Sequence, residues 1–339
     1  MAIVGGLDVH RRQITFDWLD SESGEVRRGR IPGDRLGFRA WLDQLEQRPA
    51  DFAVEGCTGW RFVVEELERA GMGAHLAEPA DTQALRGPKR HAKTDGIDAR
   101  HLRDLLRAGT LPESWIPPTH IQEMRARVRL YKELIELRTA WVQRIHAVRY
   151  HQGLPTLSPS AAPGRRRYLD GEEALSPAGR DWVAAALRLL DHVDGELAQL
   201  RALFTRFARQ QPGCRALSEE YGVGPVTAVA IWAEIGDCRR FSSSREAVRY
   251  SGLDITVYSS DAKRARGHLS RQGSPVLRWA LFEAAQCGAR PSSPDHAYHA
   301  AVKERAGSKQ AALSVARKLA RRAHHRLRSL GDQAMVPVG

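Results

Sequence analysis

The sequence predicts an α/β region followed by a largely helical one. Short apolar runs alternate with helical patterns up to about residue 116, whereas long patterns with an apolar residue every three or four positions follow. The chain has 339 residues, of which 42% are hydrophobic, so it can build roughly two domains with cores of their own. We predict an α/β domain over 1–116, a helical arm over 117–210, a mainly helical domain over 211–332 and a tail over 333–339.

The first region predicts a mixed sheet with helices packed on it. Residues 24–32 are polar and end in Pro32, which is typical of an edge strand. Asp81 is the expected cap of a short helix, and Asp17 is expected to face solvent because it alternates with aromatic neighbours. The predicted strands are 2–10, 12–20, 24–32, 51–56 and 73–79, and the predicted helices are 34–47, 59–71 and 81–87.

Two long amphipathic patterns, 121–150 and 177–209, flank a connector rich in proline, serine and arginine. Such a pair predicts antiparallel helices or a coiled coil, whose simplest role is a spacer or a dimerisation arm. Further on, Gly222 and Gly224 lie between two helical patterns. This arrangement is similar to a helix–hairpin–helix, whose glycine turn offers backbone N–H groups to a DNA phosphate, although a simple tight turn would also explain it.

Four carboxylates are the candidate metal ligands. Asp8 and Glu55 each end an apolar run, and a charge there is costly to bury without a partner. If the two strands are neighbours, both side chains emerge at one edge of the sheet. Asp95 and Asp98 lie three residues apart at the start of a helical pattern, and so share one face. Converging carboxylates need cations, and Mg²⁺ prefers such hard oxygen ligands, although helix capping and dipole effects could explain each aspartate alone.

The charge balance indicates a polyanionic partner. The formal net charge is +12, which favours nucleic acid over an anionic membrane surface. Lys89, Arg90 and Lys93 immediately precede the two aspartates and are candidates for phosphate contact. No apolar run reaches membrane-span length, no signal-peptide pattern begins the chain and the four cysteines are scattered, so we expect a soluble cytoplasmic protein.

A second candidate site is a basic, glycine-containing loop before the helical pattern that begins at Pro275. Ser259 and Ser260 stand just before its basic residues, and a serine hydroxyl can attack phosphorus when metal or cationic neighbours activate it. Its expected phosphate-binding residues are Lys263, Arg264, Arg266 and Arg271. Spacing alone favours an ordinary serine-rich loop.

The segments GLDVH, AVEGCTGW, KTDGIDARHL, GVGPVTAVAIWAEIGD and YSGLDITVYSSDAKRARGHLSRQGSPVLRWAL occur in this order. Together they resemble the DEDD transposases of the IS-one-ten family of bacterial insertion sequences, over nearly the whole chain. The resemblance implies an RNase H-type, RuvC-like first domain, a coiled-coil arm and a C-terminal transposase domain. It also implies that Asp8, Glu55, Asp95 and Asp98 bind Mg²⁺.

The resemblance further implies a serine nucleophile that links transiently to DNA, a structured non-coding RNA that pairs with target and donor DNA, and a homo-oligomer, from dimer to tetramer. The nucleophile falls on Ser260 when counted from Gly252 or Tyr258, and on Ser259 when counted back from HLSRQG. Asp261 stands where the family has glycine. We prefer Ser260.

Two other functions remain open from the residues. A hydrolytic, junction-resolving nuclease would use the four acids with water as its nucleophile, without any covalent protein–DNA intermediate. A non-catalytic nucleic-acid-binding protein derived from a transposase would bind salt-sensitively without Mg²⁺-dependent cleavage.

Overall fold

The structure is a computed structural model that describes residues 3–45, 48–86, 94–155, 172–256, 259–260, 263–264 and 267–338. For residues 259, 260, 263 and 264 it describes the backbone only. The chain forms two compact units, Met1–Ile116 and Pro117–Gly339. Within the described ranges, no helix has the length and apolar character needed to cross a bilayer.

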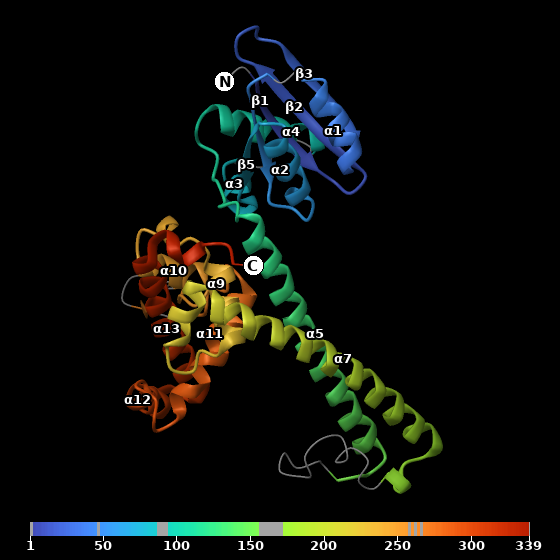
Figure 1. Cartoon of the computed structure of the whole chain (residues 1–339), viewed down its shortest axis with the longest axis vertical. Helices are drawn as coiled ribbons and strands as arrows, with labels where there is room; N and C mark the ends of the chain where they lie inside the picture. The colour runs from blue at the N-terminus through green and yellow to red at the C-terminus, as the bar shows by residue number, and fades with distance from the viewer. Residues whose placement is uncertain are drawn as a thin grey trace. The chain divides into compact units, whose positions relative to one another are not determined.

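The first unit is a mixed five-stranded sheet in the order β3-β2-β1-β4-β5, with helices packed on it (Figure 1). β3 lies at one end of this order, which confirms the predicted edge strand. β1 pairs antiparallel with β2 and parallel with β4, and this mixed order is RNase H-like. The elements are β1 Ile3–Val9, β2 Gln13–Asp20, β3 Val26–Pro32, α1 Arg35–Asp43, β4 Ala50–Glu55, α2 Trp60–Arg69, β5 Gly73–Ala77, α3 Pro79–Ala84 and α4 Asp95–Arg107.

The two faces of the sheet have different roles. Alternate residues of β1, among them Ile3 and Leu7, join an aromatic-rich core that includes Phe38 of α1 and Phe52 of β4. The other face packs against α4. Gly6 permits this contact, because a Cβ at that position would lie only 2.6 Å from the main-chain nitrogen of Arg103. The close approach brings the start of α4 to the end of β1.

Two predictions about this unit are wrong. Asp17 is buried, because it pairs with Gly6 across β2 and β1 and therefore lies on the face that α4 covers. The short helix α3 begins at Pro79 with Glu78 as its N-cap, so Asp81 is a first-turn residue and not the cap. Proline fits the first helical turn because its missing N–H has no helical partner there.

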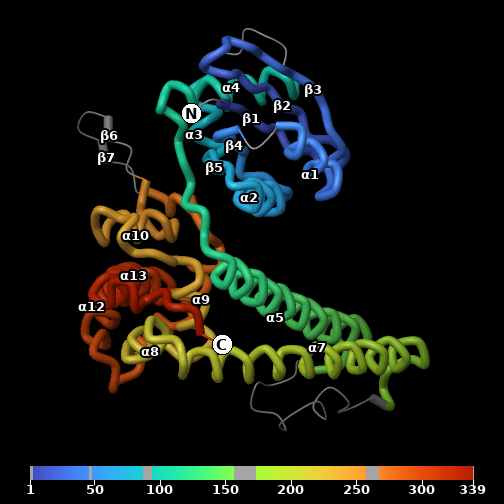
Figure 2. The backbone as a smooth tube through the Cα atoms, turned by 45° about the horizontal axis from the view of Figure 1, so that its top comes forward, coloured from blue at the N-terminus to red at the C-terminus, as the bar shows by residue number. Residues whose placement is uncertain are grey.

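The second unit is mostly helical. α5 and α7 run antiparallel, since Tyr131 contacts Phe204 near one end and Arg138 pairs with Asp194 further along. Figure 2 shows α8, α9, α12 and α13 gathered together. The elements are α5 Thr119–His151, η1 Glu172–Ala174, α7 Pro177–Gln210, α8 Pro212–Ser218, α9 Pro225–Ile235, η2 Cys238–Arg240, α10 Ser244–Tyr250, β6 Ser259–Ser260, β7 Lys263–Arg264, α11 Pro275–Gln286, η3 Cys287–Ala289, α12 His296–Ala306, α13 Ser308–Leu330 and η4 Gly331–Met335.

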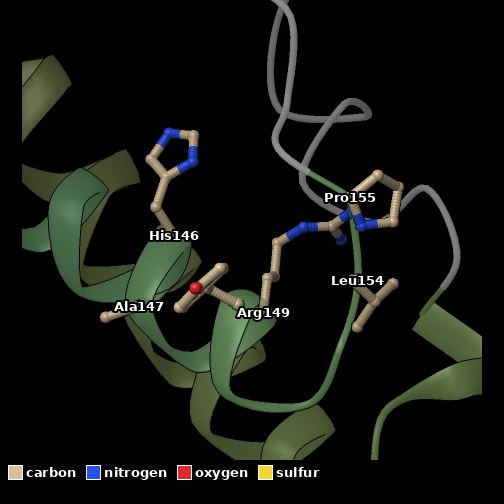
Figure 3. A pocket seen from close by; sticks show the side chains of 6 residues that line it. His146, Ala147, Arg149, Leu154 and Pro155 are labelled. Atoms are coloured by element: carbon tan, nitrogen blue, oxygen red, sulfur yellow. The ribbon is translucent and has the colours of Figure 1, made fainter.

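Both ends of this unit have defined packing. Trp232 donates a hydrogen bond of 2.7 Å from its indole nitrogen to the carbonyl oxygen of Ala334, so the C-terminal residues belong to the helical core. At the far end of α5 there is a pocket of about 300 Å³, into which the Arg149 side chain extends towards Pro155 (Figure 3). It is lined by His146, Ala147, Arg149, Tyr150, Leu154 and Pro155.

We expect Gly6→Ala to destabilise the first unit by about 2 kcal/mol, because the added methyl group forces α4 away from β1. Gly96→Ala is the matched control, since a Cβ there meets nothing within 4 Å and lies on α4 itself. Urea unfolding of the full chain would measure both changes. Equal stability of the two variants would contradict the proposed close contact.

Candidate metal centre and serine hairpin

Asp8 and Glu55 emerge at the same edge of the sheet, as predicted for neighbouring strands. β1 and β4 are parallel, and Leu7 pairs with Val54 immediately before the two carboxylates. Asp8 is only 6% exposed, whereas Glu55 is partly buried. Both side chains are therefore positioned at the carboxyl end of the parallel strands β1 and β4.

Asp95 and Asp98 reach the same edge from α4. Thr94 is the N-cap of this helix, and its side chain accepts a hydrogen bond from the main-chain nitrogen of Ile97. Both aspartates lie in the first helical turn, where negative charge is favourable to the helix dipole. Asp98 is buried and the Asp95 side chain is 38% exposed. Neither aspartate is the cap, so capping does not explain this pair.

The pKa of Asp8 responds to the charges of the other three carboxylates. Burial raises the pKa of Asp8, and the neighbouring charges of Asp95, Asp98 and Glu55 raise the pKa further, while His10 opposes the rise. Like charges that approach one another in a desolvated place disfavour ionisation. The edge of the sheet is therefore a site where added positive charge would be stabilising.

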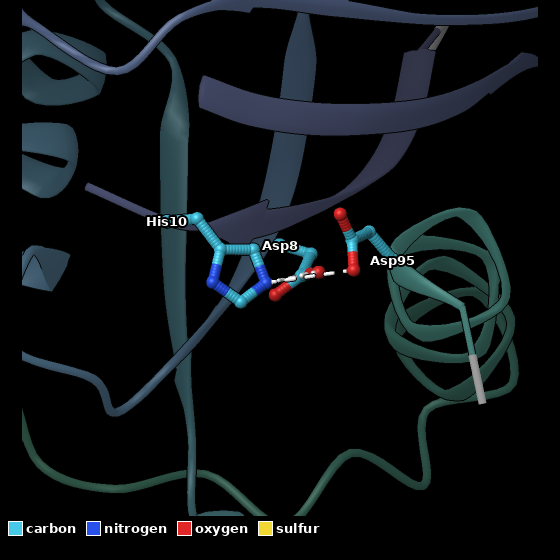
Figure 4. Close-up of side chains that lie close together, drawn as sticks. All are labelled: Asp8, His10 and Asp95. Carbon is cyan, nitrogen blue, oxygen red and sulfur yellow. Dashed lines mark ion pairs between the residues drawn. The ribbon is translucent and has the colours of Figure 1, made fainter. Parts of the chain in front are cut away.

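His10 is a residue of this site that the sequence analysis did not select. Its Nε2 atom lies 3.2 Å from Asp8 Oδ2 and 3.6 Å from Asp95 Oδ1, so it contacts both carboxylates (Figure 4). Potential ligand atoms of these three residues all lie within 4.8 Å of one another. The spacing in GLDVH contained the signal, because residues two apart on an extended chain point to the same side.

Two further side chains hold the aspartates of α4. Gln13 Nε2 donates a hydrogen bond of 3.1 Å to Asp95 Oδ2, and Arg86 forms a short ion pair with Asp98. Arg86 ends the described part of the chain before the gap at 87–93. Lys89, Arg90 and Lys93, the predicted phosphate-contacting residues, lie outside the described residues.

The donor set fits a hard divalent cation. Asp8 Oδ2 is buried and accepts no hydrogen bond from any residue that the structure describes, although His10 makes an ion-pair contact with it. A desolvated carboxylate oxygen beside a second carboxylate and an imidazole is the arrangement that a metal ion satisfies. The cluster of Asp8, His10 and Asp95 is consistent with metal binding.

Asp17 has a separate, structural role on the same face of the sheet. It forms ion pairs with Arg28 of β3 at 2.8 Å and with Arg100 and Arg103 of α4. These arginines compensate its burial, which would otherwise be costly. Asp17 thus fastens α4 to the sheet beside the carboxylate site.

The candidate serines lie in the second unit, in a short hairpin. Ser259 pairs with Arg264 and Ser260 with Lys263, as β6 and β7 run antiparallel. Arg266 lies outside the described residues. Arg271 is exposed and has a φ of 54°, which is unusual for a residue with a side chain. Lys263 and Arg264 therefore lie opposite the two serines in the hairpin, and Arg271 follows further along the chain.

The glycine turn between α8 and α9 has a packing explanation for one of its glycines. Gly222 has a φ of 88°, and a Cβ there would lie 2.9 Å from Cys287 Cβ as well as against the carbonyl oxygen of Ala284. Gly224, in contrast, is exposed, a Cβ there would meet nothing within 4 Å, and α9 begins immediately after it. Gly222 therefore serves helix packing, and Gly224 leaves a helix N-terminus open.

Asp8→Asn should stabilise the metal-free protein by about 1 kcal/mol near pH 7, because the wild-type carboxylate must ionise in a buried place. The sign follows from the raised pKa of Asp8: its ionisation opposes folding above that pKa, and the cost disappears as the pH falls below the ordinary value. Millimolar Mg²⁺ should stabilise wild type but not the variant.

Thermal unfolding with EDTA and with Mg²⁺ measures both effects. Asp104→Asn is the control, since Asp104 is an exposed carboxylate of the same helix. The metal-centre assignment would be wrong if Mg²⁺ stabilised Asp8→Asn as much as it stabilised wild type.

Comparison with known proteins places the chain among transposases. Residues 5–148 match the DEDD transposase model of IS110 elements, and residues 214–300 match the transposase model of the IS116/IS110/IS902 family. A probable family 20 transposase of Pseudomonas aeruginosa is 25% identical, over 84% of this chain and 83% of its own length. A putative transposase of Sinorhizobium fredii is 27% identical, over 83% and 70% respectively.

The transposase for insertion sequence element IS1111A of Coxiella burnetii is 22% identical, over 78% of this chain and 74% of its own length. The two family matches cover most of the first unit and parts of the second, and the match over 5–148 includes all four carboxylates and His10. This chain belongs to the IS110 family of transposases, enzymes that transfer the phosphoryl groups of DNA.

Proposed function

We propose that this transposase recombines DNA through a transient serine–DNA link, with Ser260 as the nucleophile and divalent metal held by Asp8, Glu55, Asp95 and Asp98. The observation that supports the proposal is the cluster of the buried Asp8 of β1 with His10 and with Asp95 of α4, whose potential ligand atoms lie within 4.8 Å of one another. Mg²⁺ suits this donor set, and when bound it stabilises negative charge on a reacting phosphate.

The covalent chemistry balances without any external reactant. The Ser260 hydroxyl loses its proton as its oxygen bonds to phosphorus, and the bond from phosphorus to one deoxyribose oxygen breaks, with that oxygen taking up a proton. In the second transfer a deoxyribose hydroxyl attacks the same phosphorus and the serine hydroxyl is restored. Each step exchanges one phosphodiester bond for another, so strands are cut and rejoined without hydrolysis.

The residues of this chain bind and orient the phosphate. Asp8 lies on a strand, and its position is fixed by β1 pairing on both sides. His10 and Gln13 hold Asp95, and Arg86 holds Asp98, so the carboxylates have defined places before nucleic acid arrives. Preorganised groups of this kind cost little reorganisation in the transition state.

The proposed partners are those that the family resemblance implies, and the positive charge of the chain and the exposed helix N-terminus after Gly224 support nucleic-acid binding. DNA of the element ends and of the target is the substrate, and a non-coding RNA of the element guides the choice of site. The net charge of +12 supports binding of both polyanions. The paired helices α5 and α7 form an arm that joins copies of the chain, as a dimer or a tetramer. The arm would thus be a domain of its own over 117–210, beside a serine-bearing domain over 211–332.

Adduct trapping tests the serine chemistry. The protein is co-expressed with the flanking non-coding DNA of its element, supplied with labelled end and target DNA and Mg²⁺, and denatured. We expect labelled DNA covalently bound to wild type and to Ser259→Ala, but not to Ser260→Ala, because only Ser260 carries the bond.

Asp8→Asn should lose the adduct in the same assay, whereas Asp104→Asn should keep it. An adduct lost only in Ser259→Ala would move the nucleophile by one residue. Cleavage without an adduct in any lane would refute the serine link and favour the water-using nuclease.

A further inference from the structure

We propose that Arg278 and Arg317 are positioning residues that fix the base of the serine hairpin to the helical core. The base, called the neck below, consists of residues 251–256 and 267–273. The inference rests on the proposed function, because it concerns the segment that presents Ser259 and Ser260. The evidence comes from the neck itself, which the structure describes with its side chains.

The neck contains one isolated antiparallel bridge, with main-chain hydrogen bonds on both sides of it. Ile255 and Leu269 form a bridge, and the Ser270 hydroxyl makes a short hydrogen bond to the carboxylate of Asp254. Main-chain nitrogens donate across the neck from Thr256 to His268 at 2.8 Å, from Ser270 to Asp254 at 3.0 Å and from Arg271 to Gly252 at 3.2 Å. A two-stranded pairing of this size is marginal on its own in water.

Two guanidinium groups donate hydrogen bonds to two neck carbonyls that accept none from the main-chain nitrogens across the neck. Arg278 of α11 donates from Nη1 to the carbonyl oxygen of Ser251 at 3.1 Å, and Arg317 of α13 donates from Nε to that of Leu253 at 2.6 Å. Ser251 and Leu253 are both fully buried. A buried carbonyl without a donor is costly, and a charged donor makes the stronger hydrogen bond.

The close approach of the neck to α11 supports this assignment. Gly252 has a φ of 66°, and a Cβ there would lie 2.5 Å from Nη1 of Arg278. Both guanidinium groups are partly removed from water, and this burial lowers the pKa of Arg278 and of Arg317. Each group donates to a neck carbonyl in place of water. Arginines of two different helices therefore donate to the carbonyls of Ser251 and Leu253. These two hydrogen bonds fix the position of this segment against the helical core.

This arrangement has a consequence for the chemistry. Ser259 and Ser260 lie only six and seven residues beyond Leu253 in the chain, so the segment that Arg278 and Arg317 hold is close in sequence to both serines. A neck that slips or opens would displace the serine hydroxyl from the phosphate, and small misplacements cost large factors in rate. The two arginines thus act on the reaction through the hairpin and not by touching substrate.

Hydrogen exchange of the full-length protein without nucleic acid tests the anchoring. We expect Arg317→Met and Arg278→Met to raise the exchange rates of the Thr256, Ser270 and Arg271 amides at least tenfold, while α9 stays protected. Arg321→Met is the matched control, because Arg321 is an exposed arginine of α13 and should leave the neck unchanged. Unchanged neck exchange in both variants, or an equal rise in Arg321→Met, would overturn the proposal.

A second measurement separates positioning from a general structural effect. At saturating DNA, we expect the rate of adduct formation to fall at least tenfold in Arg317→Met with unchanged DNA affinity. Arg317→Lys, which keeps a charged donor, should recover most of the rate. A loss of DNA affinity with no loss of the saturated rate would show that Arg317 contacts nucleic acid, and would overturn the positioning role.

The two readouts also distinguish this inference from the serine link. If the neck amides respond as expected and wild type forms no adduct, the arginines anchor the hairpin and the serine nucleophile is wrong. If wild type forms the adduct and the neck amides do not respond, the serine link stands and the anchoring is wrong.

Discussion

The close packing of α4 against β1 is the contact on which the candidate metal centre depends. Gly6 leaves room for the backbone of α4, and Asp17 binds arginines of that helix on the same face of the sheet. Together they bring the first turn of α4, with Asp95 and Asp98, to the end of β1. Without this contact Asp8 and Glu55 would form an ordinary acidic edge, and Asp95 would not lie beside Asp8 and His10.

Convergence has an electrostatic cost that the protein meets locally. Asp8 is buried among like charges, and His10 contacts both it and Asp95 while Arg86 binds Asp98. The Arg86 guanidinium supplies a positive charge that limits repulsion in the folded chain. The ionised carboxylates nevertheless lower the stability of the folded chain. Such a cost is common at functional sites, where charges lie together that folding alone would keep apart.

The basic excess of the chain has two uses. In the second unit several arginines donate to main-chain carbonyls, so part of their charge serves the fold. Arg125 binds the carbonyl oxygens of Ala233 and Glu234, and Arg240 binds that of Ile235, which satisfies the C-terminal end of α9. Net charge therefore indicates a polyanionic partner without showing which residues meet it, and Arg278 and Arg317 illustrate the difference.

Much of the first unit could be predicted from the sequence, because the apolar residues that recur with strand or helix spacing are also the residues that form its core. The apolar runs predicted the strands, Pro32 marked the edge, and strand-end acids marked the site. Asp17 was mispredicted because alternation shows which residues share a face, but not that α4 covers the second face. His10 was overlooked although it lies two residues after Asp8 in GLDVH, a spacing that places both side chains on one side of an extended chain. The carbonyl contacts of Arg278 and Arg317 depend on tertiary packing, which spacing does not encode.

The most direct test of the metal centre is to locate bound metal by anomalous diffraction from crystals of the full-length protein soaked in Mn²⁺, which substitutes for Mg²⁺ at oxygen-rich sites. The account predicts an anomalous peak within about 2.2 Å of carboxylate oxygens of Asp8 and Asp95. A peak elsewhere, with none beside Asp8, would contradict the claim that this edge of the sheet is the metal centre.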